Sequence, residues 1–147
     1  MPTPSRRARS VLDAFRELID ELLGAPATLR AAGVADTSDP AVLSSLTLVT
    51  SRDWALIDRI QTTIRKDVPL LKAPVDPDPT AVSAETVDEF DRARGELVSL
   101  LMNLTLKDWE RTFIDWNGRE ISVADDVENH VEFDEDQIDS IVSALQG

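Results

Sequence analysis

The sequence predicts an all-α protein, a four-helix bundle in which one long crossover connection and short extra helices join the main helices. Apolar residues recur at three- and four-residue steps in four long stretches of the 147-residue chain, which is the spacing of amphipathic helices. No comparable stretch alternates apolar and polar residues as a strand does. Because the chain has the length of one domain and no internal repeat or linker, we expect a single domain over residues 1–147.

The first predicted helix ends near Gly24-Ala25-Pro26. Its apolar stripe consists of Val11, Phe15, Leu18, Ile19 and Leu22. The basic start of the chain resembles that of a signal peptide, but four acidic residues interrupt the apolar run that a signal needs, namely Asp13, Glu17, Asp20 and Glu21. We therefore expect a cytoplasmic protein with an amphipathic first helix.

The stretch from residue 26 to residue 50 has a weaker pattern. Pro26 could open a short helix that Gly33 would end. Asp39-Pro40 could start another short helix that runs through Leu48.

A second long helix is predicted from about residue 51 to residue 71. Its apolar side consists of Trp54, Ile57, Ile60, Ile64 and Val68. Pro69 lies in the last turns and should bend or end the helix. The following segment KAPVDPDPTAVS contains three prolines, which cannot donate backbone hydrogen bonds, so we expect an extended crossover.

The third long helix is predicted to begin near Ser83 or Thr86 and to end near Asn103. The segment TLKD, residues 105–108, has the pattern of a capping box and predicts a short helix that contains Trp109 and Phe113.

Asn117-Gly118 predicts a turn, because both residue types tolerate positive φ. A second capping pattern, SVAD at residues 122–125, predicts the start of the last helix. The apolar stripe of this helix consists of Val127, Val131, Ile138, Ile141 and Leu145.

Composition excludes several classes of function. The 15 basic and 28 acidic residues give a formal net charge of −13, which repels the phosphate backbone, so we expect no nucleic-acid partner. Charged residues make up 29% of the chain and leave no apolar span long enough for a bilayer, so we expect no membrane partner. The absence of cysteine excludes disulfides, thiolate ligands and a cysteine nucleophile.

Much of the negative charge is local, since ten acidic residues and one arginine lie between Asp115 and Asp139. A solvated helix face is the ordinary use of such a run, and an acidic docking surface for a basic partner is the alternative.

Several motifs follow one another in a recognisable order between residues 90 and 141. An arginine-bearing helix (FDRARGELVSLL) precedes the turn LTLKDWER, which is followed by GREIS and the closing helix. In this order and spacing the segment resembles the DinB/YfiT-like family, whose members are helical bundles that often hold a divalent metal and include thiol transferases. The first half of the chain matches only as helices of suitable length, including TSRDWALIDRI.

The resemblance implies a metal site with one histidine from the second helix and two histidines, four residues apart, from the last helix. When the last helix is anchored on QIDSI at residues 137–141, none of the matching positions is a histidine, and His130 lies one residue off this register. The matching positions are Asp58, Asn129, Phe133 and Gln137. The resemblance therefore implies a degenerate metal site, which we expect to hold no metal cofactor.

His130 is the only histidine, so we expect a residue at the edge of the core rather than a metal ligand. An oxygen site from Asp58, Asn129 and Gln137 is an alternative for a hard ion, although neutral amides bind such ions weakly. A phenyl ring at Phe133 would instead fill the site and add about 2 kcal/mol of apolar burial.

Asp58 would need Gln137, Asn129 or Arg94 as a partner if it faces the interior, because an unpaired buried carboxylate is costly. Trp54 and Trp109 could line a pocket, although core packing is their ordinary use. Arg94 and Arg111 could bind an anion or pair with carboxylates.

The sequence leaves three functions open. The favoured function is a bundle of the DinB-like type that binds a small molecule or a protein and has lost the histidine site. The second is a divergent transferase or hydrolase, either metal-dependent or with metal-free acid–base chemistry at Asp58. The third is an interaction module that uses the acidic last helix, and homodimerisation is compatible with all three.

Overall fold

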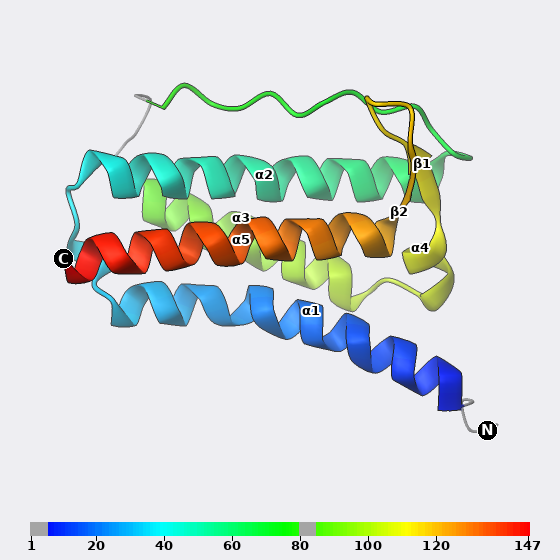
Figure 1. Ribbon diagram of the computed structural model, residues 1–147, viewed down its shortest axis with the longest axis horizontal. Helices are drawn as coiled ribbons and strands as arrows, with labels where there is room; N and C mark the ends of the chain where they lie inside the picture. Colours follow the sequence, from blue (N-terminus) through cyan, green and yellow to red (C-terminus); the bar gives the residue numbers. More distant parts are fainter. Residues whose placement is uncertain (1–5, 80–84) are drawn as a thin grey trace.

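The computed structural model describes residues 6–79 and 85–147 and contains four long helices, as Figure 1 shows. These are α1 (Arg6–Ala31), α2 (Pro40–Arg65), α3 (Thr86–Met102) and α5 (Val123–Gln146). The short elements are the 3-10 helix η1 (Val34–Asp36), helix α4 (Leu106–Glu110) and the strands β1 (Thr112–Ile114) and β2 (Glu120–Ser122). The predicted all-α four-helix bundle is confirmed.

The four long helices form a bundle in which α2 packs mainly against α3 and α5, and α1 packs against the same two helices. The segment after α2 runs back along that helix, so α2 and α3 point in the same direction (Figure 1). Helices α1 and α5 both point the opposite way. Within the described residues, no helix is long and apolar enough to cross a membrane.

The predicted break at Pro26 is wrong, because α1 continues through this proline to Ala31. Burial of Ala25 and Leu29 in the core offsets the hydrogen bond that the proline cannot make. The chain leaves the helix at Gly33, whose φ of 98° suits a residue without a Cβ.

The predicted boundary near residue 51 is also wrong, since one continuous helix begins at Pro40. Asp39 caps it by accepting a hydrogen bond from the Ala41 amide at 2.9 Å, as the Asp-Pro pattern suggested. Helix α2 ends at Arg65, before Pro69, rather than near residue 71.

The chain bends at residues 66–68, where Val68 has a φ of 41°, and the crossover then continues without a helix through residue 78, which confirms the expectation for the described part. Residues 80–84 lie outside that part, together with the alternative start of α3 at Ser83. Leu71 N–H donates to the Ile114 carbonyl at 2.9 Å, and Ile114 N–H donates to the Pro69 carbonyl at 2.8 Å. These bonds fasten the crossover to β1.

The predicted capping box at Thr105 and Asp108 is confirmed, and so is the start of α5 after Ser122. The short helix is shorter than expected, because Phe113 lies in β1 instead of α4. Strands β1 and β2 pair antiparallel, and Gly118 (φ 80°) occupies the turn between them, as the Asn-Gly pair predicted. Three residues per strand are too few to give a visible alternation in the sequence.

The apolar core consists of two clusters, which lie on either side of a polar layer. This layer is formed by the buried side chains of Asp53, Arg94 and Asp134. In α2 the buried residues up to Val49 belong to one cluster and those from Leu56 onward to the other, with Asp53 between them. Helix α3 repeats this order around Arg94, and α5 repeats it around Asp134. At this level of the bundle, α2, α3 and α5 therefore each contribute one buried charged side chain.

Candidate functional site

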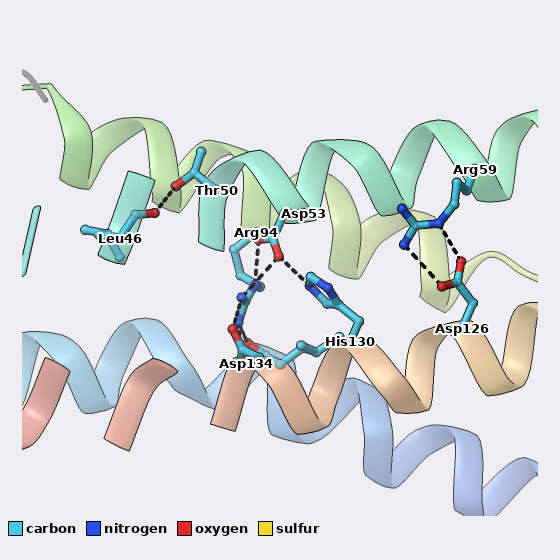
Figure 2. A network of polar contacts seen from close by, with 9 residues as sticks. Leu46, Thr50, Asp53, Arg59, Arg94, Asp126, His130 and Asp134 are labelled. Atoms are coloured by element: carbon cyan, nitrogen blue, oxygen red, sulfur yellow. Dashed lines mark hydrogen bonds and ion pairs between the residues drawn. The ribbon is translucent and has the colours of Figure 1, made fainter. Parts of the chain in front are cut away.

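Arg94 lies at the centre of the polar layer and contacts the other three long helices (Figure 2). Its guanidinium donates to the Asp53 carboxylate of α2 at 2.9 and 3.3 Å and to the Asp134 carboxylate of α5 at 2.5 and 3.2 Å. Nη1 also donates to the Leu22 carbonyl of α1 at 2.9 Å. Only 1% of Arg94 is exposed, so five hydrogen bonds replace the water that the guanidinium loses.

Helix geometry places these groups together. Asp53 continues the buried face of α2 between Val49 and Leu56, four residues after one and three before the other. Arg94 follows Phe90 by one turn, and its guanidinium carbon lies 4.9 Å from the centre of that ring.

His130 extends the polar layer along α5, one turn before Asp134 on the same face (Figure 2). Its Nε2 lies 2.7 Å from Asp53 Oδ1, and only 6% of the residue is exposed. Because a carboxylate accepts hydrogen bonds, Nε2 carries the proton and Nδ1 of the neutral ring is an acceptor. His130 is thus a buried residue in hydrogen-bond contact with a carboxylate, rather than a residue at the core edge.

The Nδ1 atom of His130 differs from the other polar atoms of this layer. Within residues 6–79 and 85–147, no hydrogen bond to Nδ1 is found. Nδ1 is not fully enclosed, in contrast to Arg111 Nε, which is buried without a hydrogen-bond partner among the described residues. Nδ1 is thus the ring nitrogen that remains for another partner, and His130 is one of the residues that line a cavity.

The burial of the charges affects their protonation. Burial raises the pKa of Asp134 more than the neighbouring Arg94 guanidinium lowers it. Burial alone would lower the pKa of Arg94, but Asp53 and Asp134 together raise it. The guanidinium therefore stays charged, and its contact with Asp134 limits the rise in the pKa of that carboxyl.

A cavity of about 300 Å³ lies beside the polar layer, between α2, α5, the β1–β2 hairpin and the crossover. Its walls carry three arginines in a chain whose net charge is −13. They are Arg52, Arg59 and Arg119. Phe133 and Trp116 supply aromatic surface. Polar and charged side chains make up more than half of the lining, and Asp115 and Asp126 lie there beside the arginines.

Two of the cavity arginines are held in place by carboxylates. Arg59 donates to Asp126 at 2.9 and 3.1 Å, from α2 to α5 (Figure 2). Arg52 donates to Asp76 of the crossover at 2.9 and 3.2 Å, and its guanidinium carbon lies 5.2 Å from the centre of the Phe133 ring. Each pair uses two of the five N–H groups of its guanidinium.

The four residues that the sequence singled out do not lie together. Asn129 and Phe133 both line the cavity of the three arginines, hereafter the arginine cavity. Gln137 is half-buried and does not line it. Asp58 is exposed and borders a different hollow beneath the crossover. The sequence left open whether Asp58 faces the interior, and it does not. Asp53 is the inward carboxylate, and five residues turn the helix by about 500°, which puts Asp58 roughly 140° away.

Two further predictions concern aromatic and basic residues. Trp54 was placed on the apolar side of α2 but is 38% exposed, whereas Trp109 is buried and stacks on Phe15 with 4.3 Å between ring centres. Arg94 was expected to pair with carboxylates or to bind an anion, and it pairs with Asp53 and Asp134.

Comparison with known proteins identifies the fold. No family model and no curated protein sequence matches the chain. Among solved structures, YfiT from Bacillus subtilis superposes with a TM-score of 0.76 at 15% sequence identity, covering 99% of this chain and 89% of YfiT. The chain therefore has the YfiT four-helix-bundle fold. YfiT itself is described as a probable metal-dependent hydrolase with an unusual four-helix-bundle topology.

The donor groups of this chain do not fit the metal that the YfiT fold suggests. The described residues contain no group of three or more histidine, cysteine, aspartate or glutamate side chains that could hold a metal ion. The one imidazole already bonds Asp53 through Nε2, and the cationic Arg94 contacts the same carboxylate. A divalent cation would have to compete with that guanidinium for its ligands.

Proposed function

We propose that this YfiT-fold protein binds a small organic anion in the arginine cavity without a bound metal. The observation that carries the proposal is the gathering of Arg52, Arg59 and Arg119 around a cavity of about 300 Å³ in a strongly acidic protein. Arginine is suited to carboxylate and phosphate groups, because its planar N–H groups match two oxygens at once.

The cavity favours an anion that also has an apolar part. The guanidinium carbon of Arg59 lies 6.0 Å from the centre of the Trp116 ring, and that of Arg52 lies over Phe133. A ligand whose charged group meets Arg59 would therefore place its remainder against aromatic surface. Asp126 and Asp76 hold the guanidinium groups in position and leave N–H groups free for the ligand.

Benzoate and its neutral counterpart benzamide provide a direct test, because they share a ring and differ in charge. We expect calorimetry to show binding of benzoate but not of benzamide, both with and without EDTA. Arg59→Gln should weaken benzoate binding by about 10- to 100-fold, the range for one charge-assisted contact. The matched control is Arg30→Gln, since Arg30 pairs with Asp91 away from this cavity and should leave binding unchanged.

Three results would contradict the proposal. They are equal binding of benzamide and benzoate, equal losses in the Arg59 and Arg30 variants, and loss of binding when EDTA removes a stoichiometric metal.

A further inference from the structure

We propose that His130 is a catalytic base of the arginine cavity, held by Asp53, and that it removes a proton next to the carbonyl group of a small oxo acid. This inference rests on the proposed function, because the carboxylate of the oxo acid is the anion that the arginines bind. The geometry of the imidazole carries the proposal.

The His130 ring is fixed from behind. Nε2 lies 2.7 Å from Asp53 Oδ1, and Asp53 is itself fixed by two hydrogen bonds from Arg94 (Figure 2). A carboxylate on one ring nitrogen determines which nitrogen carries the proton and stabilises the imidazolium that forms when the other accepts one. Asp53 is therefore a positioning residue.

The other ring nitrogen, Nδ1, is the one left for a ligand of the arginine cavity, which His130 lines. His130 is the only residue of the polar layer that lines this cavity; Asp53, Arg94 and Asp134 do not. Nδ1 has no hydrogen-bond partner among the described residues and keeps access to solvent. A buried imidazole with one nitrogen clamped and the other open to a ligand cavity is the arrangement that proton transfer requires.

Proton transfer is also the chemistry that the remaining residues can support. The chain has no cysteine nucleophile, and the described donor groups form no metal site. Removal of a proton beside a carbonyl requires only a base and a donor for the developing enolate oxygen. Arg59 and Asn129 line the cavity and can supply that donor.

The step is balanced within the site. Nδ1 takes the proton from the carbon next to the carbonyl, and the electron pair of the broken C–H bond stays on the ligand as an enolate. The imidazolium then returns a proton to the ligand. In heavy water the returned atom is deuterium, so the step appears as isotope exchange at that carbon.

Bromopyruvate and bromoacetone test the geometry, because both carry a reactive carbon beside a carbonyl and only the first is an anion. The Nδ1 lone pair displaces bromide and forms an N–C bond, and no cysteine competes for the reagent. Peptide mass spectrometry should find His130 alkylated, at least about 10-fold faster by bromopyruvate after correction for the reactivity of each reagent with N-acetylhistidine. Nitrogen-15 NMR of the alkylated protein should place the new bond on Nδ1. Arg59→Gln should abolish this preference, whereas Arg30→Gln should retain it.

Pyruvate tests the catalysis. Proton NMR in heavy water should show exchange of the pyruvate methyl protons at least about 10-fold faster with the wild type than with His130→Gln, the low end for general-base catalysis. Circular dichroism checks that the variant is folded, and Arg30→Gln, which changes a residue outside the cavity, should exchange the methyl protons as fast as the wild type.

Equal exchange with wild type and folded His130→Gln would overturn the proposal, and so would alkylation at Nε2, no alkylation of His130, or equal corrected rates for the two reagents. If benzoate still binds in those cases, only the assignment of His130 as the base fails. If benzoate binding fails as well, the anion site itself is wrong.

Discussion

Arg94→Met is expected to lower the free energy of unfolding by about 3–5 kcal/mol, the cost of removing one partner from a buried ion pair. The variant would leave the Asp53 and Asp134 carboxylates, 0% and 3% exposed, without their shared cation. Methionine has a similar length, so lost packing contributes little. Urea unfolding at neutral pH measures the loss.

The loss in Arg94→Met should shrink as the pH falls. Burial already raises the pKa of Asp134, and removal of the guanidinium raises this pKa further. A carboxyl whose pKa is higher in the folded state favours folding below its unfolded pKa and loses this contribution as the pH rises through the folded pKa. The free energy of unfolding of the variant should therefore be closest to that of the wild type near pH 4 and furthest from it at neutral pH.

Arg30→Met is the matched control, because Arg30 also links α1 to α3 but is exposed in its pair with Asp91. Its loss should stay within about 1 kcal/mol, as for other surface pairs. Similar losses for the two methionine variants would show that the central guanidinium does not neutralise buried charge.

Asp53→Ala should also destabilise the protein by about 3–5 kcal/mol, because it removes the carboxylate that both Arg94 and His130 contact. The matched control is Asp58→Ala, which changes the charge equally. Asp58 lies five residues later on the same helix but is exposed. Asp58→Ala should lower the free energy of unfolding by about 0.5 kcal/mol or less.

Thermal or urea unfolding of the two alanine variants compares them directly. A larger loss for Asp58→Ala would mean that α2 is rotated from its described position, with Asp58 inside the bundle. Equal small losses would show that Asp53 is not enclosed.

The periodic stripes predicted the long helices well, because burial of one face is repeated over several turns. Features that depend on single residues were harder to predict. Pro26 is tolerated inside α1 only because its neighbours pack in the core, and the β1–β2 hairpin is too short to have a pattern of its own. Both depend on tertiary contacts that lie far away in the sequence.

The site was predicted in part. Asn129 and Phe133 do line the cavity, but the polar layer was not recognised, and Asp58 rather than Asp53 was considered as a possible inward carboxylate. A signal for the layer was present, since Asp53 and Arg94 interrupt apolar stripes at positions where a helix faces the core. Which charges meet depends on the relative heights of three helices, and no single helix pattern determines that.

The polar layer and the arginine cavity are mechanically linked. Arg94 fixes Asp53, and Asp53 fixes the ring of His130, which is the shared member of both features. The same buried charges that make the bundle sensitive to substitution thus hold an imidazole that lines the cavity. Such a clamp limits ring rotation and keeps the tautomer fixed.

The central claim is that Asp53 clamps Nε2 of His130 and leaves Nδ1 free for the cavity. Nitrogen-15 NMR of histidine-labelled protein tests it directly, because the chain has one imidazole and its signals need no assignment. At mildly alkaline pH we predict a protonated Nε2 and an unprotonated Nδ1, with shifts that neither EDTA nor equimolar zinc changes. A protonated Nδ1, or ring signals that move with zinc in a one-to-one complex, would contradict the account.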